Sequence, residues 1–124
     1  MSLIHSTAII DKSSNIHPDA EIGPFCIIGP DTVIEENVKL LSNVVIQGKT
    51  TICSGTKVWP FTVLGGDPQD LKFKGEKGSL KIGSNNNIRE HVTMHIGTEA
   101  GGLETKVGDN NLFMAGAHIA HDCD

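Results

Sequence analysis

The sequence predicts an all-β protein, a parallel β-helix of hexapeptide repeats with about six coils. Two periodic patterns predict it: an aliphatic residue recurs every six residues, and a small residue follows each aliphatic one by four. The composition agrees, because 14 of the 124 residues are glycine, above the usual share of roughly 7%. Glycine favours the tight corners that such a coil needs.

The aliphatic repeat covers the first half of the chain without a gap. Neither a helical period of 3.6 nor a simple strand alternation explains a period of six. A very short strand followed by a corner does, and three such units return the chain to a point above its start. Each aliphatic residue then stacks on the one a coil below, about 4.8 Å away. The eleven positions are Ile4, Ile10, Ile16, Ile22, Ile28, Ile34, Leu40, Ile46, Ile52, Val58 and Leu64.

The second series contains no residue larger than valine, and we expect it to fill the corners of the coil. This spacing does not by itself set the handedness of the helix. The ten positions are Ala8, Ser14, Ala20, Cys26, Thr32, Val38, Val44, Thr50, Thr56 and Thr62.

Two interruptions of the repeat predict two external loops, at about residues 65–81 and 97–106. Loops that leave a rigid scaffold often carry function. The first loop is rich in lysine and, with Arg89 nearby, could meet phosphates or an acidic partner, or be only a solvated loop. Its lysines are Lys72, Lys74, Lys77 and Lys81. Between and after the loops, the hexads resume at Ile82, Ile88 and Met94 and at Val107, Phe113 and Ile119.

Composition excludes several classes of protein. The formal charge is 10 − 15 = −5, which argues against nucleic-acid binding through general phosphate attraction. No apolar run approaches the ~20 residues of a membrane span, and the first residues do not resemble a signal peptide. The three cysteines, Cys26, Cys53 and Cys123, cannot all pair within one chain and fit a reducing compartment. We therefore expect a cytoplasmic protein.

The length predicts one domain over residues 1–124. The final hexad, which begins at Ile119, is incomplete, and nothing after it looks like a cap. We therefore expect a β-helix that is truncated at its C-terminal end or packs this end against something else.

Histidines are concentrated near the two loops. Met94 and Ile119 are three hexads apart, which is one full coil. His95 and His121 should therefore lie on the same side of the prism, and His118 just before the same corner. The four histidines of this region are His91, His95, His118 and His121.

Three interpretations of this cluster remain open from the residues alone. His121 could act as a general base, with Asp122 orienting its ring, as acyl transfer to a hydroxyl requires. Alternatively, His118 and His121 could bind zinc together with His91 and His95. The histidines could also be ordinary surface residues.

Four segments resemble one family closely. They are similar to the bacterial acyl-carrier-protein–UDP-N-acetylglucosamine O-acyltransferases, which catalyse the first step of lipid A synthesis. The hexapeptide pattern is shared by many acyltransferases, whereas Gln-Asp-Leu-Lys and His-Ile-Ala-His-Asp-Cys are far more specific. The resemblance covers essentially the whole chain. The segments are residues 22–30, 69–73, 88–98 and 117–123.

This resemblance implies a left-handed β-helix that assembles as a homotrimer, with active sites between neighbouring subunits. It implies transfer of an (R)-3-hydroxyacyl group from acyl carrier protein to the 3-hydroxyl of UDP-N-acetylglucosamine. No cofactor or metal is needed, which favours the general base over the zinc site.

The resemblance also assigns roles to single residues. His121 matches the general base and Asp122 its polarising partner. Lys72 matches a lysine near the substrate phosphates or the acyl donor. The positions that match nucleotide-sugar contacts are Gln69, Asp70, His95 and His118.

Length separates this chain from the family, whose members continue with further coils and a C-terminal helical domain. Two alternatives remain, the first suggested by this length and the second by the histidines. One is a non-catalytic β-helix module that binds nucleotide sugar or only assembles. The other is a zinc β-helix enzyme of the carbonic-anhydrase-like kind.

Overall fold

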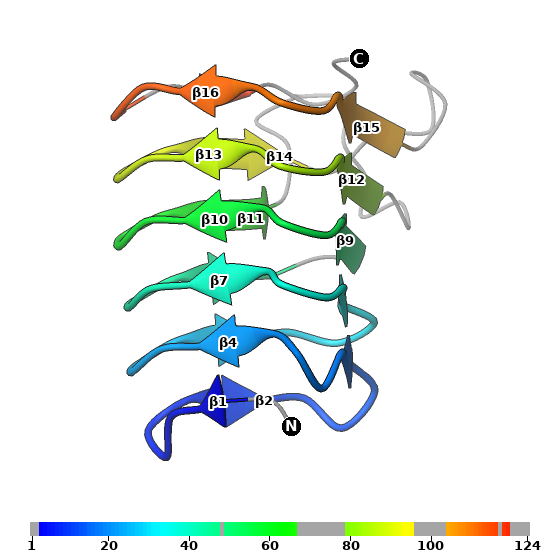
Figure 1. Ribbon diagram of the computed structural model, residues 1–124, viewed down its shortest axis with the longest axis vertical. Helices are drawn as coiled ribbons and strands as arrows, with labels where there is room; N and C mark the ends of the chain where they lie inside the picture. Colours follow the sequence, from blue (N-terminus) through cyan, green and yellow to red (C-terminus); the bar gives the residue numbers. More distant parts are fainter. Residues whose placement is uncertain (1–2, 48, 67–78, 96–103, 117, 120–124) are drawn as a thin grey trace.

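The computed structural model describes residues 3–47, 49–66, 79–95, 104–116 and 118–119, and it confirms the predicted parallel β-helix. Within these residues, seventeen short strands form three parallel sheets. The sheets are the three faces of a prism that rises from the N-terminal coil (Figure 1). No helix among the described residues is long and apolar enough to cross a membrane.

Each of the first five coils contributes one strand to each sheet, and the sixth contributes β16 and β17 among the described residues. Sheet A contains β1 (Leu3–Ile4), β4 (Glu21–Ile22), β7 (Lys39–Leu40), β10 (Lys57–Val58), β13 (Asn87–Ile88) and β16 (Leu112–Phe113). Sheet B contains β2 (Ile9–Ile10), β5 (Ile27–Ile28), β8 (Val45–Ile46), β11 (Val63–Gly66), β14 (Thr93–His95) and β17 (His118–Ile119). Sheet C contains β3 (Asn15–Ile16), β6 (Val33–Ile34), β9 (Lys49–Ile52), β12 (Ser79–Ile82) and β15 (Glu104–Val107).

The helix is left-handed, as the family resemblance implies. In Figure 1 the strands of sheet A run leftward in front, those of sheet B run rightward behind, and the chain climbs from one coil to the next. This is an exception to the right-handed crossover found in almost all other parallel β structures.

The predicted aliphatic series forms the core. Equivalent residues of successive coils are in register, so that Ile28 pairs with Ile46 and Ile46 with Leu64. From Ile22 to Met94, every position of this series is almost fully buried. Because each side chain packs between those of the coils above and below, the core is one continuous column.

The small series fills the space beside this column, and its hydroxyls are satisfied. Thr56 Oγ1 donates to the carbonyl oxygen of Gly83 at 2.8 Å, and Thr62 Oγ1 to that of Arg89 at 2.8 Å. These bonds link neighbouring coils and remove the cost of burying unpaired hydroxyls.

Most corners of the prism place one residue in the left-handed backbone region, three positions after the buried aliphatic residue. Asparagine, aspartate and glycine adopt this region most readily. Phenylalanine and histidine also adopt it here, at a conformational cost that the surrounding coils must offset. The residues with positive φ at this position are Phe25, Asp31, Asn37, Asn43, Gly55, Phe61, Asn85, His91, Asn110 and Gly116.

The first predicted loop, residues 65–81, was too long at both ends. β11 continues to Gly66, and β12 begins at Ser79. The reason is that β12 pairs residue by residue with β9, which buries Leu80 opposite Thr50. Leu80 stands two residues before Ile82, which is the position of the small series, but as a large residue it does not fit that pattern.

The second predicted loop, residues 97–106, was too long at its C-terminal end. β15 begins at Glu104 and pairs with β12, which buries Thr105 opposite Leu80. The middle parts of both predicted loops, residues 67–78 and 96–103, lie outside the described residues.

Candidate active site

The last two described strands of sheet B confirm the prediction that Met94 and Ile119 lie one coil apart. β14 and β17 are neighbours, and Met94 pairs with Ile119. His118 pairs with Thr93 in the same ladder. His95 directly follows Met94 at the end of β14. The backbone therefore brings His95 and His118 into adjacent strands, although they are far apart in sequence.

A β-bulge shapes the end of β11 at this place. Leu64 pairs with Met94, but Gly66 rather than Gly65 pairs with His95. Gly65 has a φ of 74°, in the left-handed region that glycine adopts without strain. Such bulges redirect a strand where pairing ends. Here the chain passes into residues 67–78 directly beside the backbone of His95.

The remaining predicted site residues fall outside the part of the chain that the structure describes. They are Gln69, Asp70, Lys72, His121 and Asp122. In sequence, Gln69 follows Gly66 by three residues and His121 follows Ile119 by two. The roles of all seven predicted residues, His95 and His118 included, therefore stay predictions.

His91 does not join this group. It lies at the corner that precedes β14, whereas His95 is the last residue of that strand. Its ring stacks on Phe61, with 5.7 Å between the ring centroids and 11° between the planes. Because a strand spreads its residues along about 3.3 Å each, the metal site proposed from His91 and His95 is not favoured.

Arg89, which the sequence analysis grouped with the lysine-rich loop, contacts Trp59 and Glu90. Its guanidinium carbon is 4.3 Å from the ring centroid of Trp59, and Lys57 Nζ lies at the same distance from that centroid. Arg89 Nε also pairs with Glu90 Oε1 at 3.0 Å. These contacts place Arg89 after β13, on the sheet A side of the prism.

One group of metal-ligating side chains among the described residues was missed by the sequence analysis. His17, Asp19 and Glu36 each offer a ligand atom, and these atoms lie within 4.8 Å of one another. His17 Nδ1 already accepts the backbone N–H of Asp19 at 3.0 Å. The coil length of eighteen residues could have found this group, because it places Glu36 one coil above Pro18.

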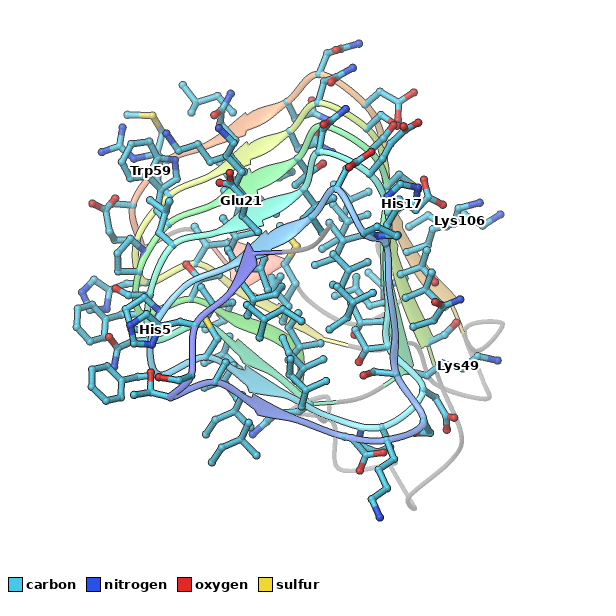
Figure 2. All side chains as sticks on the ribbon, turned by 60° about the horizontal axis from the view of Figure 1, so that its bottom comes forward. His5, His17, Glu21, Lys49, Trp59 and Lys106 are labelled. Carbon is cyan, nitrogen blue, oxygen red and sulfur yellow. The ribbon has the colours of Figure 1, made fainter. Side chains whose placement is uncertain are left out.

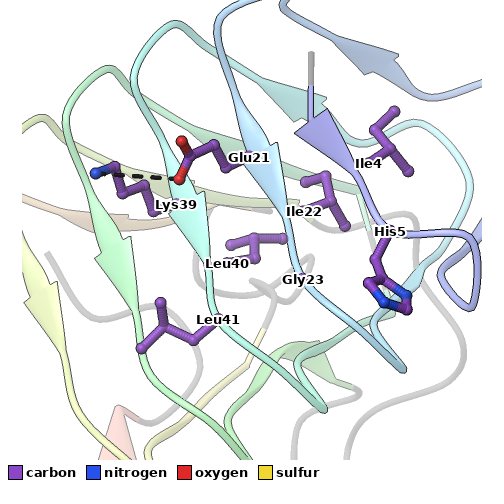
Figure 3. Close-up of a pocket in the computed structure, with 8 residues that line it drawn as sticks. All are labelled: Ile4, His5, Glu21, Ile22, Gly23, Lys39, Leu40 and Leu41. Atoms are coloured by element: carbon purple, nitrogen blue, oxygen red, sulfur yellow. Dashed lines mark ion pairs between the residues drawn. The ribbon is translucent and has the colours of Figure 1, made fainter.

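The surface carries a hollow near the N-terminal end of sheet A, over β1, β4 and β7 (Figure 3). It has a volume of about 500 Å³ and a largely apolar lining that includes Ile4, Leu40 and Leu41. At its rim, Lys39 Nζ and Glu21 Oε2 are 4.0 Å apart, as the dashed line marks.

The fold and the sequence repeat together define the structural class of this protein. Residues 31–66 match the family described as bacterial transferase hexapeptide (six repeats). The described coils continue the same register on both sides of this segment. The chain is thus a left-handed β-helix of the hexapeptide-repeat kind.

More specific relatives cover nearly the whole chain. It is 49% identical over 122 residues to the acyl-[acyl-carrier-protein]–UDP-N-acetylglucosamine O-acyltransferase of Rickettsia canadensis, with 98% of this chain and 46% of the relative covered. The enzyme of that name from Rickettsia africae is 52% identical with the same coverage.

Solved structures agree with these relatives. LpxA from Acinetobacter baumannii superimposes with a TM-score of 0.96 at 51% identity and covers 98% of this chain and 47% of its own. UDP-N-acetylglucosamine acyltransferase from Arabidopsis gives a TM-score of 0.76 at 29% identity, with 98% of this chain and 50% of its own covered. The predicted resemblance to these O-acyltransferases is therefore confirmed. The chain spans about half the length of the curated relatives it matches.

Proposed function

We propose that this chain provides the catalytic coils of an O-acyltransferase that acts on UDP-N-acetylglucosamine. The observation that carries this proposal is the pairing of β14 with β17, next to the bulge that ends β11. It supports a single site to which His95, His118 and the following residues contribute. The identity of about 50% to proteins named for this reaction supports the substrate class.

In the proposed reaction, His121 removes the proton from the 3-hydroxyl of the sugar. The oxygen attacks the carbonyl carbon of an (R)-3-hydroxyacyl thioester on acyl carrier protein. The carbon–sulfur bond then breaks, and the protonated imidazole returns its proton to the leaving thiolate. Asp122 would hold the second ring nitrogen of His121 in its protonated form. The product would enter lipid A synthesis in the cytoplasm.

The other predicted residues would bind and orient the substrates. Gln69, Asp70, His95 and His118 would contact the nucleotide sugar. Lys72 would lie close to its phosphates or to the acyl donor. Holding the two substrates in line lowers the entropic part of the barrier.

We further propose that the chain forms a homotrimer with its sites between subunits. The outer face of sheet B supports this, because its outward positions are aliphatic over four coils. Ile9 is 65% exposed and Ile27 43%, and Val45 and Val63 continue the same row. A row of this kind on one face is typical of a surface that another chain covers. Changing Ile27 to lysine should shift the sedimentation profile from trimer to monomer.

The reaction is tested by incubating the chain with UDP-N-acetylglucosamine and 3-hydroxyacyl carrier proteins, and detecting acylated product by mass spectrometry. His121→Ala should abolish product. His5→Ala is the matched control, because His5 is an exposed histidine of the first coil. Calorimetry with UDP-N-acetylglucosamine runs beside the assay.

The outcomes separate the alternatives. Product that is lost in His121→Ala and kept in His5→Ala supports the proposal. Binding of the nucleotide sugar without product would instead identify a non-catalytic binding module. Equal product from His121→Ala and the unchanged chain would refute the assigned base.

A further inference from the structure

The outer face of sheet C carries two lysines side by side. Lys81 of β12 pairs directly with Lys106 of β15, and both are exposed. Figure 2 shows Lys106 on the opposite side of the prism from Trp59. Like charges in register destabilise a sheet, and this chain is acidic overall. An anion bound between the two ammonium groups would be attracted by both.

A cavity of about 380 Å³ lies between these lysines and the corner that follows sheet C. Two glycines, Gly83 and Gly108, line it at a position where the lower coils carry side chains. At Gly108, an added Cβ would meet only Asn111 Nδ2, at 3.7 Å. The residues that line the cavity are Cys53, Lys81, Gly83, Lys106, Val107, Gly108 and Asp109.

One carboxylate is fixed at the edge of this cavity. Asp109 Oδ1 accepts the backbone N–H of Ser84 at 2.7 Å. The same oxygen occupies the space that a side chain at Gly83 would need. Asp109 is therefore held beside the cavity, and an incoming ligand must satisfy its carboxylate as well as the two lysines.

Cys53 contributes a neutral thiol rather than a charge. Burial raises its pKa, and the Glu35 carboxylate beside it acts in the same direction. The thiol is therefore protonated at neutral pH and can donate a weak hydrogen bond. Two ammonium groups and one carboxylate therefore line the cavity itself.

We propose that this sheet C cavity binds inorganic phosphate. Lys81 and Lys106 would bind two of its oxygens as charge-assisted donors. The protonated oxygen of hydrogen phosphate would donate to Asp109. Sulfate has the same shape but no proton at neutral pH, so it would place a bare anionic oxygen against this carboxylate. The cavity should therefore prefer phosphate to sulfate.

This cavity lies at the ends of β12 and β15 in sheet C, whereas the observations behind the proposed acyltransferase site concern β11, β14 and β17 in sheet B. Its test therefore needs no acyl transfer. Increasing amounts of potassium phosphate or potassium sulfate are added to the ¹⁵N-labelled chain at constant ionic strength. Amide shifts are followed by NMR. Phosphate should move the Gly83 and Gly108 signals in a saturable way, with a dissociation constant at least about tenfold below that for sulfate.

Variants identify the groups that hold the ion. Lys81→Gln and Lys106→Gln should each weaken phosphate binding about tenfold or more. Lys49→Gln is the matched control, because Lys49 is an exposed lysine of sheet C that pairs with Ser79 rather than with a lysine. It should change binding less than twofold. Asp109→Asn should reduce the preference for phosphate over sulfate.

Three results would overturn the proposal. Shifts that do not saturate, or that are not concentrated at the two glycines, mean no site. Equal affinity for phosphate and sulfate with no response to Lys81→Gln means an adventitious ion only. If Lys49→Gln loses as much phosphate affinity as Lys106→Gln, phosphate is attracted by the positive charges of sheet C in general and not by a site. Unchanged NMR spectra of the free variants establish that each variant is folded.

Discussion

Truncation of one core leucine should reveal how much a single level of the column contributes. Leu40 lies in sheet A between Ile22 and Val58 and is 2% exposed. Leu40→Ala removes three carbon atoms, which costs roughly 2.4 kcal/mol in lost transfer free energy at ~0.8 kcal/mol each. The cavity left behind adds to this, because backbone on both sides fixes the spacing of the coils. We expect a total loss of about 3–4 kcal/mol.

Leu112 is the matched control, since it occupies an outward position of the same sheet and is 61% exposed. Leu112→Ala should cost less than about 1 kcal/mol. The free energy of unfolding is measured by urea titration, followed by the fluorescence of Trp59, the sole tryptophan. Similar losses in the two variants, or a loss below about 1 kcal/mol in Leu40→Ala, would refute the stacked-column account.

Two other predictions concern a corner and a buried thiol. In Gly23→Ala the new Cβ would overlap the backbone carbonyl of Leu41. We therefore expect the free energy of unfolding, measured by urea titration, to fall by about 2 kcal/mol or more. Gly108→Ala is the control and should change this free energy by less than ~1 kcal/mol. Similar values for these two variants would contradict the close approach of coils. Burial raises the pKa of the Cys26 thiol in the folded protein. The contribution of this thiol to stability is therefore complete below its unfolded-state pKa of about 8.5. It is lost as the pH rises through the folded-state pKa. The unfolding free energy should therefore fall between about pH 8 and 10.5 less steeply in Cys26→Ala than in the unchanged chain; equal slopes would contradict this.

The core could be predicted because its periodicity is imposed by geometry. A coil of three faces with one inward aliphatic residue per face admits only large side chains at Ile46 and its equivalents. The small partner position is equally restricted, as the burial of Val44 and Thr62 confirms. Handedness required the family resemblance, because the same spacing fits a coil of either hand.

The loop boundaries were wrong because strand length is not encoded by the six-residue period. Leu80 and Thr105 are inward residues that precede the hexad positions by two. They extend β12 through its pairing with β9 and β15 through its pairing with β12, which is a tertiary effect.

The candidate site was predictable only to the level of the backbone. Counting hexads places His95 and His118 in adjacent strands, and the register confirms this. His91 was grouped with them because it is close in sequence, but it stands three residues after Ile88, at a corner and not in a strand. Its positive φ and its stacking on Phe61 come from the preceding corner.

The pH dependence of acyl transfer tests the proposed histidine base most directly. Initial rates with UDP-N-acetylglucosamine and a 3-hydroxyacyl carrier protein are measured from about pH 5 to pH 8. An imidazole base predicts rates that rise about tenfold per pH unit at low pH and level off above the imidazole pKa, ordinarily about 6.5. The rise should be lost in His121→Ala. A flat profile, or the same rise in His121→Ala, would contradict the account.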